Sequence, residues 1–142
     1  MLARIYKSME KKDRGFTLIE LLVVMIIIGI LAAIAIPVFL SQRAKAQDSA
    51  AKADVSTIGK EIATFYVDGT GAPPTVSKNA GGHWVLGTVD IGKASDNVAK
   101  IDQSGTGDTD WCIAVENLKG SQKYYVYSAA DGLTTGTAAG CP

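Results

Sequence analysis

The chain has 142 residues, enough for one domain with an appendage and too few for two full domains. Its formal net charge is zero, but residues 1–15 carry five basic and two acidic side chains, and the remainder carries nine basic and twelve acidic ones. A mildly acidic body argues against a nucleic-acid partner, which needs Lys and Arg clustered on one face. The basic first segment is typical of a cytoplasmic anchor before a membrane segment.

An apolar run follows from Leu21 to Leu40 and contains no charged or polar side chain. Twenty residues in a helix rise about 30 Å, which is the thickness of a bilayer's hydrocarbon core. A helix in a soluble core is the alternative, but such a helix has a polar face and this run has none. The run therefore predicts a membrane-spanning helix.

The pattern turns amphipathic after Ser41. Apolar residues then recur at helical spacings of three and four: Ala51, Val55, Ile58, Ile62 and Phe65. Lys52, Lys60 and Glu61 fall away from this stripe, so one face needs a cover that the rest of the chain must supply. We expect one helix over residues 16 to about 68, ended by Gly69 in the left-handed conformation of a helix C-cap.

Three strand candidates follow a connection rich in Gly and Pro: Trp84–Leu86 with Val89, Asp110–Glu116, and Lys123–Ser128. In the second candidate, Trp111, Ile113 and Val115 fall on one side, as in a half-buried strand. Leu118–Ser121 predicts a short hairpin between the last two strands. We expect an α+β fold in which one long N-terminal helix packs its amphipathic half on a small antiparallel β-sheet.

Two cysteines, Cys112 and Cys141, lie outside the apolar run with 28 residues between them. Their spacing excludes a CxxC metal or redox pair. Two free thiols are expected in a reducing cytosol, whereas export of this part of the chain favours a disulfide. Such a bond would join the C-terminal tail to a central strand and stabilise a thin core by about 3–4 kcal/mol.

A carboxylate at Glu20 precedes the apolar run by a single position. An ionisable side chain inside a membrane helix is costly and is functional by default. The alternative is that Glu20 lies at the level of the lipid headgroups, where its charge costs little. The physics of a single charge leaves both interpretations open.

The residues around Glu20, Gly15-Phe16-Thr17-Leu18-Ile19-Glu20, closely resemble the class III signal sequence of type IV pilins and pseudopilins. The resemblance implies that a membrane peptidase cuts after Gly15 and methylates the amine of Phe16. It also implies that Glu20 of one subunit accepts the Phe16 amine of another in a filament. Gly29 and Pro37 fall where pilins often have helix breakers. The match by sequence covers about residues 11–45.

The resemblance also implies an organisation and a set of partners. Residues 1–15 become a leader peptide, 16–40 a transmembrane and filament-core segment, and 41–142 an amphipathic helix with a β domain. The implied function is that of a structural subunit of a type IV pilus or related filament, without a cofactor. Its partners are copies of itself, a prepilin peptidase and methyltransferase, an assembly ATPase, a platform protein and the membrane. The precursor crosses the membrane once with its N-terminus cytoplasmic, and the assembled filament is extracellular.

Two other functions remain open at this point. Within the family, the chain could be a pseudopilin or competence-type pilin of a secretion or DNA-uptake system. Outside it, Ala33-Ile34-Ala35 forms an A-x-A pattern after an apolar run, as in an ordinary secretory signal peptide. That interpretation gives a secreted binding domain beginning at Ile36. The length of the run, Glu20 and the nearby Pro37 argue against it.

Enzymatic activity has little support in the sequence. His83 is the only histidine and is expected in a loop beside Trp84. Gly105–Asp110 is rich in glycine but lacks the Lys-Ser/Thr of a phosphate loop. Three aspartates could bind calcium, although a solvated turn is the simpler expectation because the spacing differs from an EF-hand: Asp108, Asp110 and Asp131. Three tyrosines are expected to alternate between sheet packing and contacts with other subunits: Tyr124, Tyr125 and Tyr127.

Overall fold

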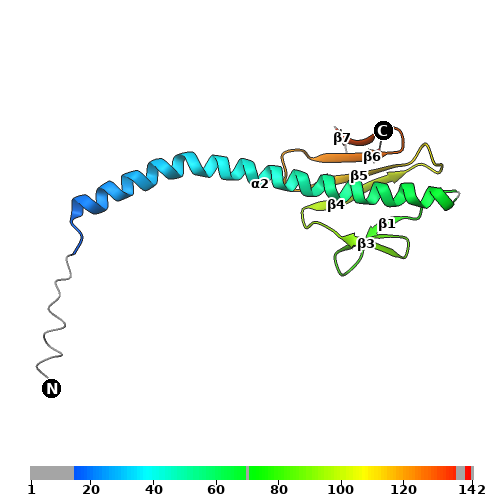
Figure 1. Ribbon diagram of the computed structural model, residues 1–142, viewed down its shortest axis with the longest axis horizontal. Helices are drawn as coiled ribbons and strands as arrows, with labels where there is room; N and C mark the ends of the chain where they lie inside the picture. Colours follow the sequence, from blue (N-terminus) through cyan, green and yellow to red (C-terminus); the bar gives the residue numbers. More distant parts are fainter. Residues whose placement is uncertain (1–14, 70, 137–139, 142) are drawn as a thin grey trace, which may run out of the picture. The chain divides into compact units, whose positions relative to one another are not determined.

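The computed structural model describes residues 15–69, 71–136 and 140–141 (Figure 1). The chain divides into two compact units, Met1–Phe39 and Leu40–Pro142. Helix α2, Leu18–Asp68, has residues in both units. We call residues 18–39 of this helix the apolar half and residues 40–68 the packed half.

Helix α2 begins at Leu18, two residues later than predicted from the sequence, and contains Pro37 in its interior. It ends at Asp68, as predicted. The predicted left-handed cap at Gly69 is wrong, because Gly69 is not among the glycines with positive φ. Instead, the Gly69 amide continues the helical pattern and donates to the Phe65 carbonyl at 2.7 Å. Glycine suits this position because a Cβ would press against the backbone and ring of Phe65.

The packed half buries the apolar stripe that the sequence predicts. Four of its side chains have no exposed surface: Ala51, Val55, Ile58 and Ile62. Phe65 is half-buried, and Lys52 and Lys60 are exposed. The stripe faces the strands of the second unit, which supply its cover (Figure 1).

The expected α+β fold is confirmed, but the strands in the described residues form two antiparallel sheets rather than one. Sheet β1-β2-β3 comprises Val76–Lys78, His83–Leu86 and Val89–Lys93. Sheet β4-β5-β6-β7 comprises Val98–Ser104, Cys112–Asn117, Tyr124–Ser128 and Gly132–Gly136. A second sheet was not expected because β1, β4 and β7 are short or contain Gly, Lys or Asp, which give a weak strand signal.

Each sheet is a meander in which strands consecutive in sequence pair with each other. The predicted hairpin is confirmed: β5 pairs with β6, with Ile113 opposite Tyr127 and Val115 opposite Tyr125. The first strand candidate, Trp84–Leu86 with Val89, forms the β2–β3 hairpin, whose register shifts between Trp84 and Val85.

Alternation along β5 separates two clusters of buried side chains. Trp111, Ile113 and Val115 join the helix stripe in the main core, as the sequence predicts. The intervening Cys112 and Ala114 belong to a second cluster. The main core also takes in Tyr125 from β6 and Trp84 from β2, so both sheets share it.

A buried carboxylate, Asp54, ties the packed half to the first sheet. It accepts hydrogen bonds from the Trp84 indole nitrogen at 2.9 Å, from the Ser95 amide at 2.8 Å and from the Ser95 hydroxyl at 3.0 Å. A buried charge is tolerated only when donors surround it. Asp54 therefore fixes where the β2 strand and the segment after β3 lie on the helix.

A second polar network ties the beginning of the packed half to the β5–β6 turn. Asp48 accepts from the Asn117 side-chain amide at 2.8 Å and from the Gln122 backbone at 3.1 Å. The Asn97 side chain donates to the Asn117 side chain at 2.8 Å and to the Gln47 carbonyl at 3.1 Å. These bonds fix the turn at residues 118–123 beside Asp48.

Candidate functional site

Three residues precede helix α2 in the described part of the chain: Gly15, Phe16 and Thr17. All three are exposed, and the Phe16 side chain is 90% exposed. A Cβ placed at Gly15 meets no described atom within 4 Å. The predicted cleavage position thus lies on non-helical chain, which proteases bind more readily than a helix.

Thr17 and Glu20 close the N-terminus of the helix by exchanging hydrogen bonds. The Glu20 Oε2 atom accepts from the Thr17 amide at 2.9 Å and from the Thr17 hydroxyl at 2.7 Å. The Glu20 amide donates in turn to the Thr17 hydroxyl at 3.3 Å. This is a capping box, which satisfies amide donors that have no partner within the helix.

A role was predicted from the sequence for Glu20 but not for Thr17. The signal was present, because Thr17-Leu18-Ile19-Glu20 has the T-x-x-E spacing of a capping box directly before an apolar run. Thr17 directly follows Phe16 and holds the Glu20 carboxylate through its amide and its hydroxyl. Both Thr17 hydrogen bonds are accepted by Oε2, so the second oxygen of the carboxylate, Oε1, does not take part in the cap.

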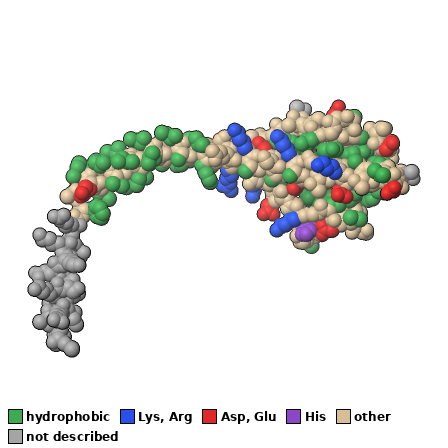
Figure 2. Space-filling view, in the orientation of Figure 1, with side chains coloured by type: hydrophobic (Ala, Val, Ile, Leu, Met, Phe, Trp, Pro, Cys, Tyr) green, Lys and Arg blue, Asp and Glu red, His purple; other side chains and the backbone are tan. Residues whose placement is uncertain are grey.

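The apolar half exposes its large side chains on every side of the helix. Between Leu18 and Phe39 these side chains are 46–82% exposed. Helix α2 is the one described helix long and apolar enough to cross a membrane. Figure 2 shows an almost continuous hydrophobic surface along this half, with an acidic side chain near its beginning. A surface of this extent marks contact with lipid or with other protein chains.

Gly29 and Pro37 both lie inside helix α2, which continues through each of them. Pro37 has no amide hydrogen, so the carbonyl four residues earlier lacks its usual helical donor. No other described side chain comes within 4 Å of a Cβ at Gly29. The helix-breaking role of both residues in a filament stays a prediction.

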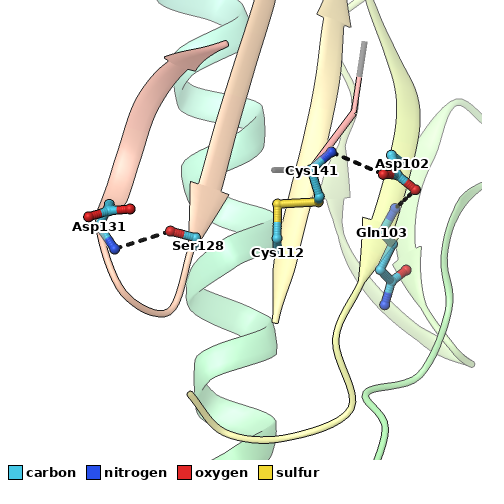
Figure 3. Close-up of a disulfide and its surroundings, with 6 residues drawn as sticks. All are labelled: Asp102, Gln103, Cys112, Ser128, Asp131 and Cys141. Carbon is cyan, nitrogen blue, oxygen red and sulfur yellow. Dashed lines mark hydrogen bonds between the residues drawn. A yellow bond between two sulfur atoms is a disulfide. The ribbon is translucent and has the colours of Figure 1, made fainter. Parts of the chain in front are cut away.

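The predicted disulfide between Cys112 and Cys141 is present, with the two Cα atoms 5.8 Å apart (Figure 3). The Cys141 amide also donates to Asp102 on β4 at 3.0 Å. Cys141 packs on the second buried cluster, which contains Ala114 and Val126. The tail is therefore fixed to the face of the second sheet opposite the main core.

The aspartates weighed as calcium ligands lie at turns. Asp110 accepts from the Thr106 amide at 3.1 Å and from the Gly107 amide at 2.6 Å, and so closes its own loop. Across residues 15–69, 71–136 and 140–141, no three His, Cys, Asp or Glu side chains come together as metal ligands. Asp131 lies in the β6–β7 turn, where its amide donates to the Ser128 hydroxyl at 3.1 Å.

The remaining candidate residues have structural partners. His83 is the first residue of β2 rather than a loop residue, and its Nδ1 lies 2.8 Å from an Asp90 carboxylate oxygen. Tyr125 is buried, and Tyr127 stacks on Trp111 with ring centroids 5.9 Å apart. Burial and the nearby Asp48 raise the pKa of Tyr125.

The buried Tyr66 hydroxyl has no hydrogen-bond partner among the described residues. Burial, followed by the nearby Asp110 and Asp108 charges, raises the pKa of Tyr66. Tyr66 borders a hollow of about 310 Å³ at the end of the helix, together with Gly69, Gly107 and Asp108.

Comparison with known proteins identifies the family. The model of the prokaryotic N-terminal methylation motif matches residues 11–36. The type IV major fimbrial protein FimA of Dichelobacter nodosus is 33% identical over 130 residues, which cover 87% of this chain and 79% of the relative. The chain belongs to the type IV pilin family. A match of this extent includes the β domain of the pilin as well as its first helix.

Two further relatives match this pilin over shorter segments. The type IV major pilin protein PilA of Myxococcus xanthus is 47% identical over 55 residues, 39% of this chain and 25% of the relative. The type II secretion system core protein G of Dickeya chrysanthemi is 33% identical over 67 residues, 47% of this chain and 44% of the relative. The pilin spans less than half of each of these two proteins. No solved structure matches it.

Proposed function

We propose that this pilin is the structural subunit of a type IV pilus, assembled through the apolar half of its first helix. The observation that carries the proposal is that apolar surface, which one copy of the chain leaves exposed on every side. Lipid covers it in the precursor, and the same halves of neighbouring copies cover it in the filament. The membership in the pilin family and the methylation motif over residues 11–36 support this assignment.

Processing removes residues 1–15 and leaves Phe16 as a methylated N-terminus. The non-helical, exposed chain at Gly15 and Phe16 supports cleavage between them by a membrane peptidase that also carries the methyltransferase. The leader's five basic side chains favour a cytoplasmic N-terminus, since Lys and Arg accumulate on that side of a membrane segment. The β domain then lies outside, where a disulfide is stable.

Glu20 has two tasks in this mechanism, one for each carboxylate oxygen. Oε2 accepts the Thr17 donors and keeps the helix N-terminus closed. We assign Oε1 to the Phe16 amine of another copy. Pairing neutralises two charges that would otherwise be buried alone in the apolar filament core, where each is strongly unfavourable. It also sets the axial register between copies.

The family's assembly apparatus follows as a set of partners for this chain. An assembly ATPase drives extraction from the membrane, and a platform protein receives the cleaved subunit. Glycine and proline weaken helical hydrogen bonding locally. The apolar half can therefore adjust its backbone at Gly29 and Pro37 when it packs against neighbouring copies.

A pseudopilin of a secretion system is the second candidate, favoured by the match to core protein G over 47% of the chain. That match falls short of the one to the fimbrial protein, which covers 87% of the chain. The additional coverage reaches the β domain, the part of a pilin that forms the filament surface. We therefore assign the pilus.

The first test is the mass of the mature protein. We expect an N-terminus at Phe16 with one methyl group, and unprocessed precursor when Gly15 is replaced by Leu. A mature N-terminus at Ile36 would establish the secreted domain instead.

The second test separates processing from assembly. Glu20→Ala keeps the basic leader, Gly15 and the apolar run, so it should be inserted and cleaved but form few filaments. Glu20→Gln should give an intermediate yield, and Glu61→Ala in the packed half serves as the matched control. Filaments are counted by electron microscopy of sheared cells. Normal filament yield from Glu20→Ala would refute the pairing with Phe16.

A further inference from the structure

The second unit carries a group of acidic side chains at one end and a group of basic side chains at the other. The far end of the unit, where the packed half ends, carries four exposed carboxylates that we call the acidic end: Asp68, Asp108, Asp110 and Asp131. The segments that form this end are 62–69, 71–77, 103–111 and 128–132, and they contain no Lys or Arg. Figure 2 shows acidic and no basic side chains at the right-hand end of this face.

Contacts between elements bring the acidic end together. Asp108 lines the same hollow as Tyr66 and Gly69 at the end of the helix. Asp110 and Asp108 add to the effect of burial, which is the main cause of the raised pKa of Tyr66. The Ala129 amide donates to the Trp111 carbonyl at 3.0 Å, which places the turn that holds Asp131 beside the loop that holds Asp110. Asp68 is the last residue of the helix.

The other end of the same unit carries exposed basic side chains that we call the basic collar: Arg43, Lys45, Lys52, Lys119 and Lys123. Lys45 and Lys52 lie about one helical turn on either side of Asp48. Lys119 and Lys123 lie in the segment between β5 and β6, which Asp48 holds. Lys45 and Asp68 are 23 residues apart on one helix, which corresponds to about 35 Å.

Two of the three carboxylates near the collar have partners within the domain. Asp48 accepts from Asn117 and Gln122, and Glu116 pairs with Lys123 at 3.4 Å. Asp96 borders a hollow that Lys93 also lines, at the side of the collar. The collar therefore keeps a surplus of positive charge, while the acidic end has only negative charge in its described residues.

We propose that the acidic end of one copy docks on the basic collar of the next copy along the filament. This inference rests on the proposed function. A filament of identical subunits needs two different, complementary surfaces on each copy, because one self-complementary surface closes a dimer. The separated charges supply such a pair. Exposed ion pairs stabilise little individually, so this contact chiefly selects orientation and register and weakens as salt screens it.

Reversing the charge at one end tests the contact. The collar variant is Lys45→Glu/Lys119→Glu and the acidic-end variant is Asp108→Lys/Asp131→Lys, both at exposed positions. Each variant alone should lower filament yield at least about tenfold, because like charges then face each other across the interface. Lys60→Glu/Lys78→Glu, outside both ends, changes net charge as the collar variant does and should assemble normally. Thermal unfolding checks that every variant is folded.

Two rescues distinguish docking from a local defect. A chain with all four reversals should recover filaments, because each new collar again meets an end of opposite charge. Co-expression of the collar and acidic-end variants should also recover them, as filaments in which both proteins are found by mass spectrometry.

Each failure has a separate meaning. Normal yield from both single-end variants would overturn the docking contact, and so would failure of both rescues with folded proteins. An unaltered chain that is processed and forms no filaments would instead overturn the proposed function.

Discussion

The two halves of helix α2 share a backbone conformation and differ in what covers their side chains. In the apolar half, large side chains are 46–82% exposed in a single copy, whereas Ala51, Val55, Ile58 and Ile62 of the packed half are completely buried. The difference arises from where polar residues stand in the sequence. A run without a polar face needs cover on all sides, which only lipid or other copies provide. A run with one polar face needs cover on one side, which the chain's own sheets provide.

Replacement of Ile by Lys should impair the stability of the domain in the packed half and membrane insertion in the apolar half. Ile58→Lys places an unpaired charge in the main core and should destabilise the β domain by about 5 kcal/mol or more. Ile28→Lys, at a position 54% exposed in one copy, should leave the unfolding of the domain unchanged. It should instead weaken membrane insertion and raise the fraction of precursor that is extracted, since a central Lys costs a membrane helix about 2.5–3.5 kcal/mol. Thermal unfolding in detergent and alkaline extraction of membranes measure the two effects. An unfolded domain in Ile28→Lys would contradict the independence of the halves.

Two carboxylates of helix α2, one in each half, differ in the same way. Asp54 binds the Trp84 indole and the Ser95 amide inside the domain, whereas Glu20 binds only its neighbour Thr17 among the described residues. Asp54→Ala should destabilise the domain by about 2–4 kcal/mol, because each buried donor left without an acceptor costs about 1–3 kcal/mol. Glu20→Ala is the matched control and should leave the unfolding of the domain unchanged. Chemical denaturation measures both, and equal losses would contradict the distinction.

Two glycines form a third pair. A Cβ at Gly59 would fall on the ring of Tyr127, whereas a Cβ at Gly29 meets no other described side chain. Gly59→Ala should therefore destabilise the domain by about 1–3 kcal/mol through overpacking. Gly29→Ala should not change domain stability. A neutral Gly59→Ala would show that Tyr127 moves aside freely, and a lower near-ultraviolet signal from the tyrosines would report such a movement.

The smallest expected effect is a gain in stability at Tyr66. Tyr66→Phe removes a buried hydroxyl that has no partner in the described structure, and should stabilise the domain by about 1 kcal/mol.

The same substitution should change the alkaline pH dependence. Burial, followed by Asp110 and Asp108, raises the pKa of Tyr66 above its unfolded value. The unfolded chain therefore loses the Tyr66 proton at a lower pH than the folded domain does. The domain keeps its full stability with respect to this group below about pH 10 and loses stability as the pH rises through the raised pKa. Tyr66→Phe should lose stability less steeply above that pH. The raised pKa of Tyr125 leaves part of the slope in place. An unchanged slope would refute the titration of Tyr66.

The elements that the sequence predicted correctly had strong periodic patterns. The helix end at Asp68, the buried stripe and the β5–β6 hairpin follow from spacings of three, four and two in apolar residues. Strands β1, β4 and β7 lack such alternation. Pairing with neighbouring strands holds β4 and β7 in place, and β1 has an additional contact with Gln103 of β4. Gln103 bridges the sheets, accepting from the Val76 amide at 2.8 Å and donating to the Pro74 carbonyl at 3.0 Å. Contacts between residues distant in sequence leave no local pattern.

Among the functional residues as well, those in a contiguous motif were found from the sequence and those with distant partners were not. The positions of Gly15, Phe16 and Glu20 came from a contiguous motif, and the roles assigned to them stay predictions. Thr17 was not predicted although its spacing to Glu20 is that of a capping box, because the motif was interpreted from the Glu20 charge and not from the unsatisfied amides of a helix start. Asp54 could not be recognised, since its partners Trp84 and Ser95 lie 30 and 41 residues away.

The Cys112–Cys141 bond also changes the covalent topology of the domain. It closes a ring that contains strands β5, β6 and β7 and their two turns. One proteolytic cut in the exposed turn at Ala130 or Asp131 would open the ring but leave both fragments covalently joined by the disulfide. Two cuts in the ring, or one cut and a reductant, are needed before any fragment separates. A filament built from such subunits would keep its surface intact through isolated cleavage events outside the cell.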